Sequence, residues 1–143
     1  MKFVLSALAF ALAASCVTAA PEEDRVPYLP GMGHFDKYGA FSGYLDIADT
    51  SKKIHYLFFE AQENSKDAPV LIWFNGGPGC SSMLGFMQEN GPFRLESGGT
   101  IFHESEYSWN RETNLLYIEQ PAGVGFSYCN SLKDCSFNDE KSG

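Results

Sequence analysis

The stretch WFNGGPGCSSMLGFMQENGP occupies residues 73–92, and the rest of the chain is best interpreted around it. An apolar run at 70–74 leads into a glycine-rich turn at 75–79, and a second apolar-rich segment follows at 81–90. This order predicts a strand, a sharp loop and a short helix. Because the first run is apolar without interruption, we expect its strand to be buried on both faces.

The turn at 75–79 can direct several backbone N–H groups toward one point, because glycine adopts backbone conformations that other residues avoid. Such a cluster of N–H groups stabilises negative charge that develops during a reaction. The sequence therefore predicts a functional loop at the end of this strand.

Length and composition limit the classes of protein to consider. The 143 residues fit one domain at most, and a hydrophobic share of 44% is enough for a core. The formal net charge of −8 argues against nucleic acid and against an anionic membrane surface as partners. Twelve Phe and seven Tyr indicate either a well-packed domain or an aromatic-lined site.

Residues 1–19 have the pattern of a secretory signal peptide. Lys2 provides the basic start, residues 3–17 are apolar and rich in small side chains, and Val-Thr-Ala at 17–19 fits cleavage after Ala19. A membrane anchor is the alternative, but the run is shorter than the ~20 residues that a span needs. We expect a mature chain that begins at Ala20 in the secretory pathway, with no membrane partner after cleavage.

Three cysteines, Cys80, Cys129 and Cys135, would remain in the mature chain. A secreted protein favours disulfides, and Cys129 can bridge to Cys135 if their Cα atoms come within about 6–7 Å. Cys80 would then be a free thiol, would bond to another molecule, or would have its partner beyond these residues.

The wider pattern predicts an α/β fold. Segments 41–47 and 53–59 flank turn-forming residues and predict an antiparallel hairpin, and 93–100 predicts a smaller hairpin that turns at Gly98 and Gly99. Segment 114–119 predicts a second central strand. Strands that alternate with helices after a first hairpin indicate a mixed sheet, antiparallel at its N-terminal edge and parallel thereafter.

A second loop rich in Gly and Pro, at 120–125, follows the strand predicted at 114–119. In open α/β sheets the functional loops lie beyond the carboxyl ends of the parallel strands. We therefore expect this loop and the one at 75–79 both to lie at that end of the sheet.

Residues 75–82, NGGPGCSS, resemble the oxyanion-loop signature of the serine carboxypeptidase family. The resemblance extends over roughly 26–143, through motifs in the family's order: VP and LPG within 26–31, GYL at 43–45, the Trp73 strand, ENGP at 89–92, WN at 109–110, and 114–128. It implies an α/β-hydrolase fold with a Ser-Asp-His triad in that chain order. It also implies removal of C-terminal residues from peptides, best at acidic pH, without a metal or cofactor.

The resemblance implies roles for five residues. The Gly77 N–H would donate to the oxyanion, and Asn75, the Gly76 N–H and Glu89 would hold the substrate's terminal carboxylate, with Trp73 in support. A carboxylate that faces Glu89 is repelled unless one of the two is protonated, so such a site should bind best below neutral pH. The alternative for Glu89 is an ordinary surface charge at a helix end.

The chain contains no Gly-x-Ser-x-Gly, the motif that carries the nucleophile in this fold. Ser127 is a near miss, but the motif's last glycine is missing and no strand leads into it. His34, His55 and His103 precede any nucleophile, against the family's order, and are expected at the surface or satisfied by hydrogen bonds. We therefore expect residues 20–143 to be the N-terminal portion of a serine carboxypeptidase domain, an incomplete α/β-hydrolase fold truncated before the nucleophile.

The function expected from the resemblance is serine-type carboxypeptidase activity, with the C-termini of peptides or proteins as partners and a lysosomal, vacuolar or extracellular location. This chain would hold the oxyanion and carboxylate-binding half, would be inactive alone, and would pair Cys80 with a cysteine further downstream. An acyltransferase of the same family and a non-catalytic secreted binding or protective protein on the same scaffold are the alternatives.

Overall fold

The computed structural model describes residues 20–96, 98–99, 101–131 and 133–135. The expected signal peptide at 1–19 lies outside the described residues. Among the helices that are described, none is long and apolar enough to cross a membrane.

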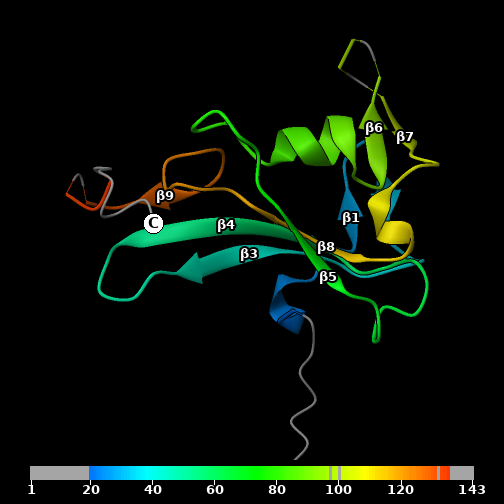
Figure 1. Cartoon of the computed structure of the whole chain (residues 1–143), viewed down its shortest axis with the longest axis horizontal. Helices are drawn as coiled ribbons and strands as arrows, with labels where there is room; N and C mark the ends of the chain where they lie inside the picture. Colours follow the sequence, from blue (N-terminus) through cyan, green and yellow to red (C-terminus); the bar gives the residue numbers. More distant parts are fainter. Residues whose placement is uncertain (1–19, 97, 100, 132, 136–143) are drawn as a thin grey trace, which may run out of the picture.

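A mixed sheet forms the centre of the molecule (Figure 1), with neighbouring strands in the order β3-β4-β8-β5. Strand β3 (Ala40–Asp46) pairs antiparallel with β4 (Lys52–Phe59), and β4 pairs antiparallel with β8 (Asn114–Ile118). Strand β5 (Val70–Trp73) runs parallel to β8, and the short β9 (Tyr128–Cys129) pairs with the start of β4. The predicted mixed sheet and its N-terminal hairpin are confirmed.

Smaller elements surround this sheet. The expected hairpin after Pro92 is present, although its second strand begins later than predicted, at Phe102. The remaining elements are the 3-10 turns η1 (Glu22–Asp24) and η3 (Trp109–Arg111), the helix η2 (Gly85–Glu89), and the pairs β1 (Tyr28–Leu29) with β2 (Gly33–His34) and β6 (Phe93–Leu95) with β7 (Phe102–Glu104).

The core lies on both faces of the sheet, because side chains alternate along β4. Phe59 is fully buried with Leu115 and Tyr117, and its ring stacks on Phe86 of η2 at 5.2 Å between centroids. Tyr56 and Phe58 point to the opposite face, where they pack with Phe41 and Ala20. Helix η2 therefore covers the face of the sheet that carries Phe59. Figure 1 shows a helix lying over one face of the sheet.

The prediction that the strand at 70–74 is buried on both faces is wrong. Leu71 and Trp73 pack against the core that η2 covers, whereas Val70 and Ile72 are 56% and 50% exposed. The reason is that the second face of β5, which carries Val70 and Ile72, is left uncovered by the described residues. β5 is also the edge strand of the described sheet.

The predicted helix at 81–90 is present in a shorter and wider form. In its first turn the Phe86 N–H donates to the Ser82 carbonyl, four residues earlier. In its last turn the Asn90 N–H donates to the Gly85 carbonyl, five residues earlier, which makes that turn wider than an α-helical one. Such wide turns are rare and occur often at functional sites.

Candidate active-site loops

Two loops meet at the carboxyl ends of the parallel strands β5 and β8, because each loop follows one of these strands. The first spans residues 74–82 and leads into η2, and the second spans 119–127. They approach each other at Gly79, where an added Cβ would lie 4.0 Å from the Val124 side chain. This placement confirms what the strand order predicted.

The Asn75 side chain is held in one orientation by two donors. Its amide oxygen accepts hydrogen bonds from Trp73 Nε1 at 2.8 Å and from the Gly85 N–H at 3.1 Å. Because both donors require an oxygen, the amide nitrogen must point the other way. Nδ2 donates to no described residue, so it is free to donate to a ligand.

Gly85 allows this arrangement by having no side chain. A Cβ at Gly85 would lie 2.1 Å from Trp73 Nε1, so any larger residue would push helix η2 away from Asn75. The glycine inside the predicted helix is therefore a packing requirement of the loop.

Two backbone donors lie at the exposed tip of the first loop. The turn is closed by the Cys80 N–H, which donates to the Gly76 carbonyl at 3.3 Å. The N–H groups of Gly76 and Gly77 donate to no other described residue. Gly77 has a φ of 141°, and a Cβ there would lie 3.0 Å from the backbone nitrogens of Gly79 and Cys80. The sequence thus places glycine where the turn is most crowded.

Ser82 attaches the first loop to the central strand. Its hydroxyl donates to the Ile118 carbonyl of β8 at 2.6 Å and accepts from the Asn75 N–H at 3.2 Å. Ser81 beside it donates to the Glu119 carboxylate and accepts from the Met83 N–H, as a helix cap does. Sequence reasoning did not identify these anchors. The available signal was a Glu directly after the apolar run of β8.

Glu89 is at the end of η2, one helical turn beyond Gly85, and its side chain is exposed. Burial raises the pKa of Tyr117, and the nearby charge of Glu89 raises it further. The Glu89 carboxylate is therefore close enough to Tyr117 for its charge to act on the phenol. The carboxylate forms no hydrogen bond or ion pair with a described residue.

The histidines and the serine that the sequence excluded as base or nucleophile are placed as follows. His34 and His103 are exposed. His55 is buried between Ser42 Oγ and Glu119 Oε2, each 2.9 Å from a ring nitrogen. The Ser127 hydroxyl is buried and donates to the Glu119 carbonyl at 2.5 Å. In the part of the chain described, no three His, Cys, Asp or Glu side chains gather as metal ligands.

Two hollows on the described surface lie away from the loop tip. One, of about 420 Å³, is lined by residues such as Tyr38, Pro92 and Arg111, and the other, of about 450 Å³, lies beside Trp109. Gly76 and Gly77 themselves are exposed.

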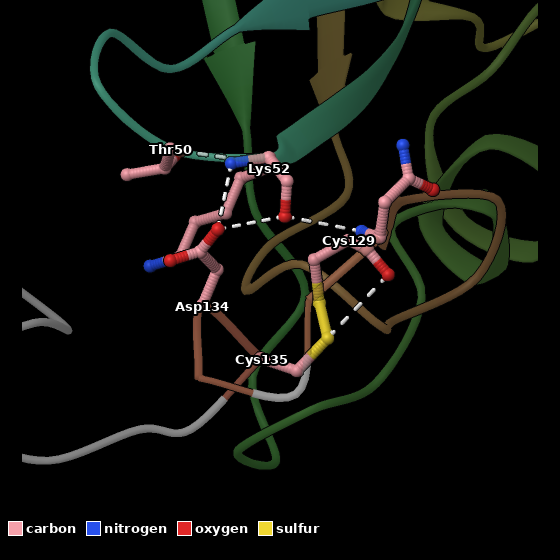
Figure 2. Close-up of a disulfide and its surroundings, with 7 residues drawn as sticks. Thr50, Lys52, Cys129, Asp134 and Cys135 are labelled. Carbon is pink, nitrogen blue, oxygen red and sulfur yellow. Dashed lines mark hydrogen bonds between the residues drawn. A yellow bond between two sulfur atoms is a disulfide. The ribbon is translucent and has the colours of Figure 1, made fainter.

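The disulfide predicted between Cys129 and Cys135 is confirmed, with a Cα–Cα distance of 5.8 Å. Figure 2 shows the bridge beside Lys52, at the point where β9 pairs with β4. Asp134 ties the same loop to the turn between β3 and β4, because its carboxylate accepts from the Ser51 N–H at 2.8 Å and from the Ser51 hydroxyl at 2.7 Å. Cys80 is a free, exposed thiol.

Comparisons with known proteins show which family this chain resembles. A family model described as serine carboxypeptidase matches residues 30–143. The lysosomal protective protein of Mus musculus is 48% identical over 110 residues, which cover 77% of this chain and 23% of that protein. The P-(S)-hydroxymandelonitrile lyase of Sorghum bicolor is 44% identical over 123 residues, which cover 84% of this chain and 24% of that protein.

The fold also matches a solved structure, that of a prohormone-processing carboxypeptidase from Saccharomyces cerevisiae. The TM-score is 0.63 and the identity 32%, over 84% of this chain and 28% of that one. The chain thus spans about a quarter of the length of the relatives it matches.

Proposed function

Because this chain belongs to the serine carboxypeptidase family, we propose that its two loops form the oxyanion and carboxylate-binding half of a serine-type carboxypeptidase active site. The whole protein would remove single residues from the C-termini of peptides. The substrates would be peptide or protein C-termini, which the exposed tip of the 74–82 loop would receive.

One observation carries the proposal: the fixed orientation of Asn75. Its oxygen is occupied by Trp73 Nε1 and the Gly85 N–H, so that Nδ2 is left to donate. The unengaged Gly76 N–H lies next to it in the chain. Two donors close together on an exposed loop suit an anionic ligand with two oxygens, and a peptide's C-terminal carboxylate is one.

The Gly77 N–H would serve the reacting carbonyl. It lies one residue beyond the carboxylate donors, which fits a ligand whose terminal carboxylate and scissile carbonyl are one residue apart. A single oxyanion donor stabilises a transition state by on the order of 3 kcal/mol.

Glu89 would complete the carboxylate clamp. Its exposed carboxylate bonds to no described residue, so it is available to share a proton with the carboxylate of a substrate. Such a shared proton is present only when one of the two groups is protonated, and we therefore propose that substrates bind best at acidic pH.

The 143 residues would be inactive alone, because they contain no Gly-x-Ser-x-Gly. We propose that residues 1–19 are a signal peptide and that 20–143 are part of a larger catalytic domain. A relative named lysosomal protective protein and the signal-like start together support a route through the secretory pathway, to a lysosome, a vacuole or the exterior.

A relative named as a lyase shows that a related chain can bear a different activity name. An acyltransferase and a non-catalytic secreted protein remain alternatives on the same scaffold. The proposed clamp binds a ligand only through a free carboxylate. A requirement for that carboxylate therefore distinguishes the proposed function from these alternatives.

The test compares two ligands on the isotope-labelled chain by NMR. Acetyl-Ala-Phe with a free C-terminal carboxylate should shift the backbone amide of Gly76 and the side-chain amide of Asn75. The same peptide with a C-terminal amide should leave both signals in place. Equal responses to the two peptides, or no response to either, would exclude the carboxylate clamp.

A further inference from the structure

A buried carboxylate lies beneath the two loops. Glu119 follows β8 directly and is 0% exposed. A buried charge is costly unless it is paired and hydrogen-bonded. Its oxygens meet this requirement: Oε1 accepts from the Ser81 hydroxyl, and Oε2 accepts from the Phe126 N–H at 2.8 Å and contacts His55 Nδ1 at 2.9 Å.

The partners of Glu119 come from three separate parts of the chain. Ser81 belongs to the first loop, Phe126 to the second, and His55 to the middle of β4. Gly125 permits the second loop to wrap this closely, since a Cβ there would lie 1.9 Å from Glu119 Oε1. The carboxylate is therefore a junction that sets the position of both loops relative to the sheet.

His55 orients this junction. An ionised carboxylate only accepts hydrogen bonds, so Nδ1 of His55 must be the donor to Glu119. The other ring nitrogen, Nε2, lies 2.9 Å from the Ser42 hydroxyl of β3. Contacts at both nitrogens prevent the ring from turning, and the sheet thereby fixes the direction of the Glu119 carboxylate.

The two ends of the first loop are held by different contacts. Asn75 is held by Trp73, Gly85 and Ser82. The other end, beyond Gly77, is held by two serines: Ser81 donates to Glu119 at the buried junction, and Ser82 donates to the Ile118 carbonyl of β8. Ser81 is the one nearer to Gly77, so loss of its contact should loosen the residues between Gly77 and Ser81, while Ser82 keeps Asn75 in place.

We propose that Glu119, oriented by His55, is a positioning residue that fixes the Gly77 N–H through Ser81. The role of the Gly77 N–H as an oxyanion donor rests on the function proposed above. The role of Glu119 in fixing the position of this N–H does not depend on that function, and it can be tested without any reaction.

The experiment measures backbone order at Gly77 by ¹⁵N relaxation in the 143-residue chain. In the unsubstituted chain the order parameter should be that of rigid backbone, about 0.85, and in Ser81→Ala it should fall below about 0.6. Ser81→Thr keeps the hydroxyl and should restore the order. Ser51→Ala is the matched control, because this serine donates to Asp134 at the distant β3–β4 turn.

Substitution of Glu119 separates hydrogen bonding from charge. In Glu119→Gln the amide oxygen can accept from His55 and Phe126 while the amide nitrogen donates to Ser81, so order at Gly77 should be kept. Glu119→Ala should lose it. If Glu119→Ala does not fold, the measurement on Ser81→Ala still decides the question, because Ser81 is partly exposed.

Binding of acetyl-Ala-Phe with a free carboxylate is measured on the same samples. Ser81→Ala should bind it within about threefold of the unsubstituted chain, because the Asn75 half stays in place. In the complete enzyme the same change should lower kcat by up to about 100-fold with little change in KM. Unchanged order at Gly77 in a folded Ser81→Ala chain would overturn the proposal. If the unsubstituted chain binds no peptide, the proposed function is wrong. The order parameter of Gly77 still tests whether Glu119 and Ser81 fix the loop.

Discussion

Replacement of Asn75 by Asp tests the carboxylate clamp with the smallest possible change of shape. The aspartate keeps one oxygen that can accept from both Trp73 Nε1 and the Gly85 N–H, which donate to the asparagine oxygen at 2.8 and 3.1 Å. What is lost is the Nδ2 donor, and what is gained is one negative charge at the tip of the loop. The fold should therefore persist while binding of a carboxylate fails.

The size of the effect follows from the contacts. A hydrogen bond to a charged group contributes about 1.5–3 kcal/mol, and every 1.4 kcal/mol is a factor of about ten in affinity. Loss of the donor alone should thus weaken binding by about 10-fold to 150-fold. Repulsion between two carboxylates adds to this, by about 4 kcal/mol for charges 4 Å apart near a protein surface. We expect at least a tenfold loss near neutral pH.

The assay is a titration of the chain with acetyl-Ala-Phe as the free acid, followed by NMR, together with a urea unfolding curve. Gln88→Glu is the control, because it adds the same charge at an exposed position of η2 without touching Asn75. It should weaken binding by less than threefold. If Asn75→Asp binds the free acid as tightly as the unsubstituted chain, Asn75 does not hold the carboxylate and the proposed clamp is wrong.

Four further outcomes are expected. Gly125→Ala should destabilise the chain by about 2 kcal/mol or more in urea unfolding, because the position has a φ of 54° and its Cβ would meet a buried carboxylate. Gly123→Ala has a φ of 99° and open space around it, so it should cost clearly less; equal losses would mean that backbone strain alone matters. Replacing both Cys129 and Cys135 by Ser should cost about 2 kcal/mol from loop-closure entropy, and an unchanged urea midpoint would contradict this. Burial raises the pKa of Tyr117 above its ordinary value, so its contribution to stability is complete below about pH 10 and is lost as the pH rises further. The urea midpoint should then fall more steeply above pH 10 in the unsubstituted chain than in Tyr117→Phe, and parallel curves would argue against it. The 143-residue chain should hydrolyse no peptide and take up no serine-directed phosphonate, and labelling of any serine would overturn the assignment of the nucleophile to residues outside it.

Interactions between residues close in sequence could be predicted without the structure. Alternating side chains at 41–47 and 53–59 were sufficient for the hairpin, because a strand repeats every two residues. The glycine-rich turn was evident from residues 75–79. The Cys129–Cys135 bridge was expected because the two cysteines are close in sequence in a polar loop. Each of these features depends on a short segment, whose conformational preference is determined by its own residues.

The contacts that hold the candidate site join residues far apart in the chain, and only the tertiary structure decided them. His55 meets Glu119 across 64 positions, and Ser81 meets it across 38. The first pair depends on the register between β4 and β8, and the second on the pairing of β5 with β8. A slip of one residue in β4 would turn His55 to the opposite face of the sheet. The exposure of Val70 and Ile72 was decided in the same way, by what packs on the second face of β5. The sequence by itself therefore determined the loop and its glycines, while strand pairing over long range decided what holds that loop in place.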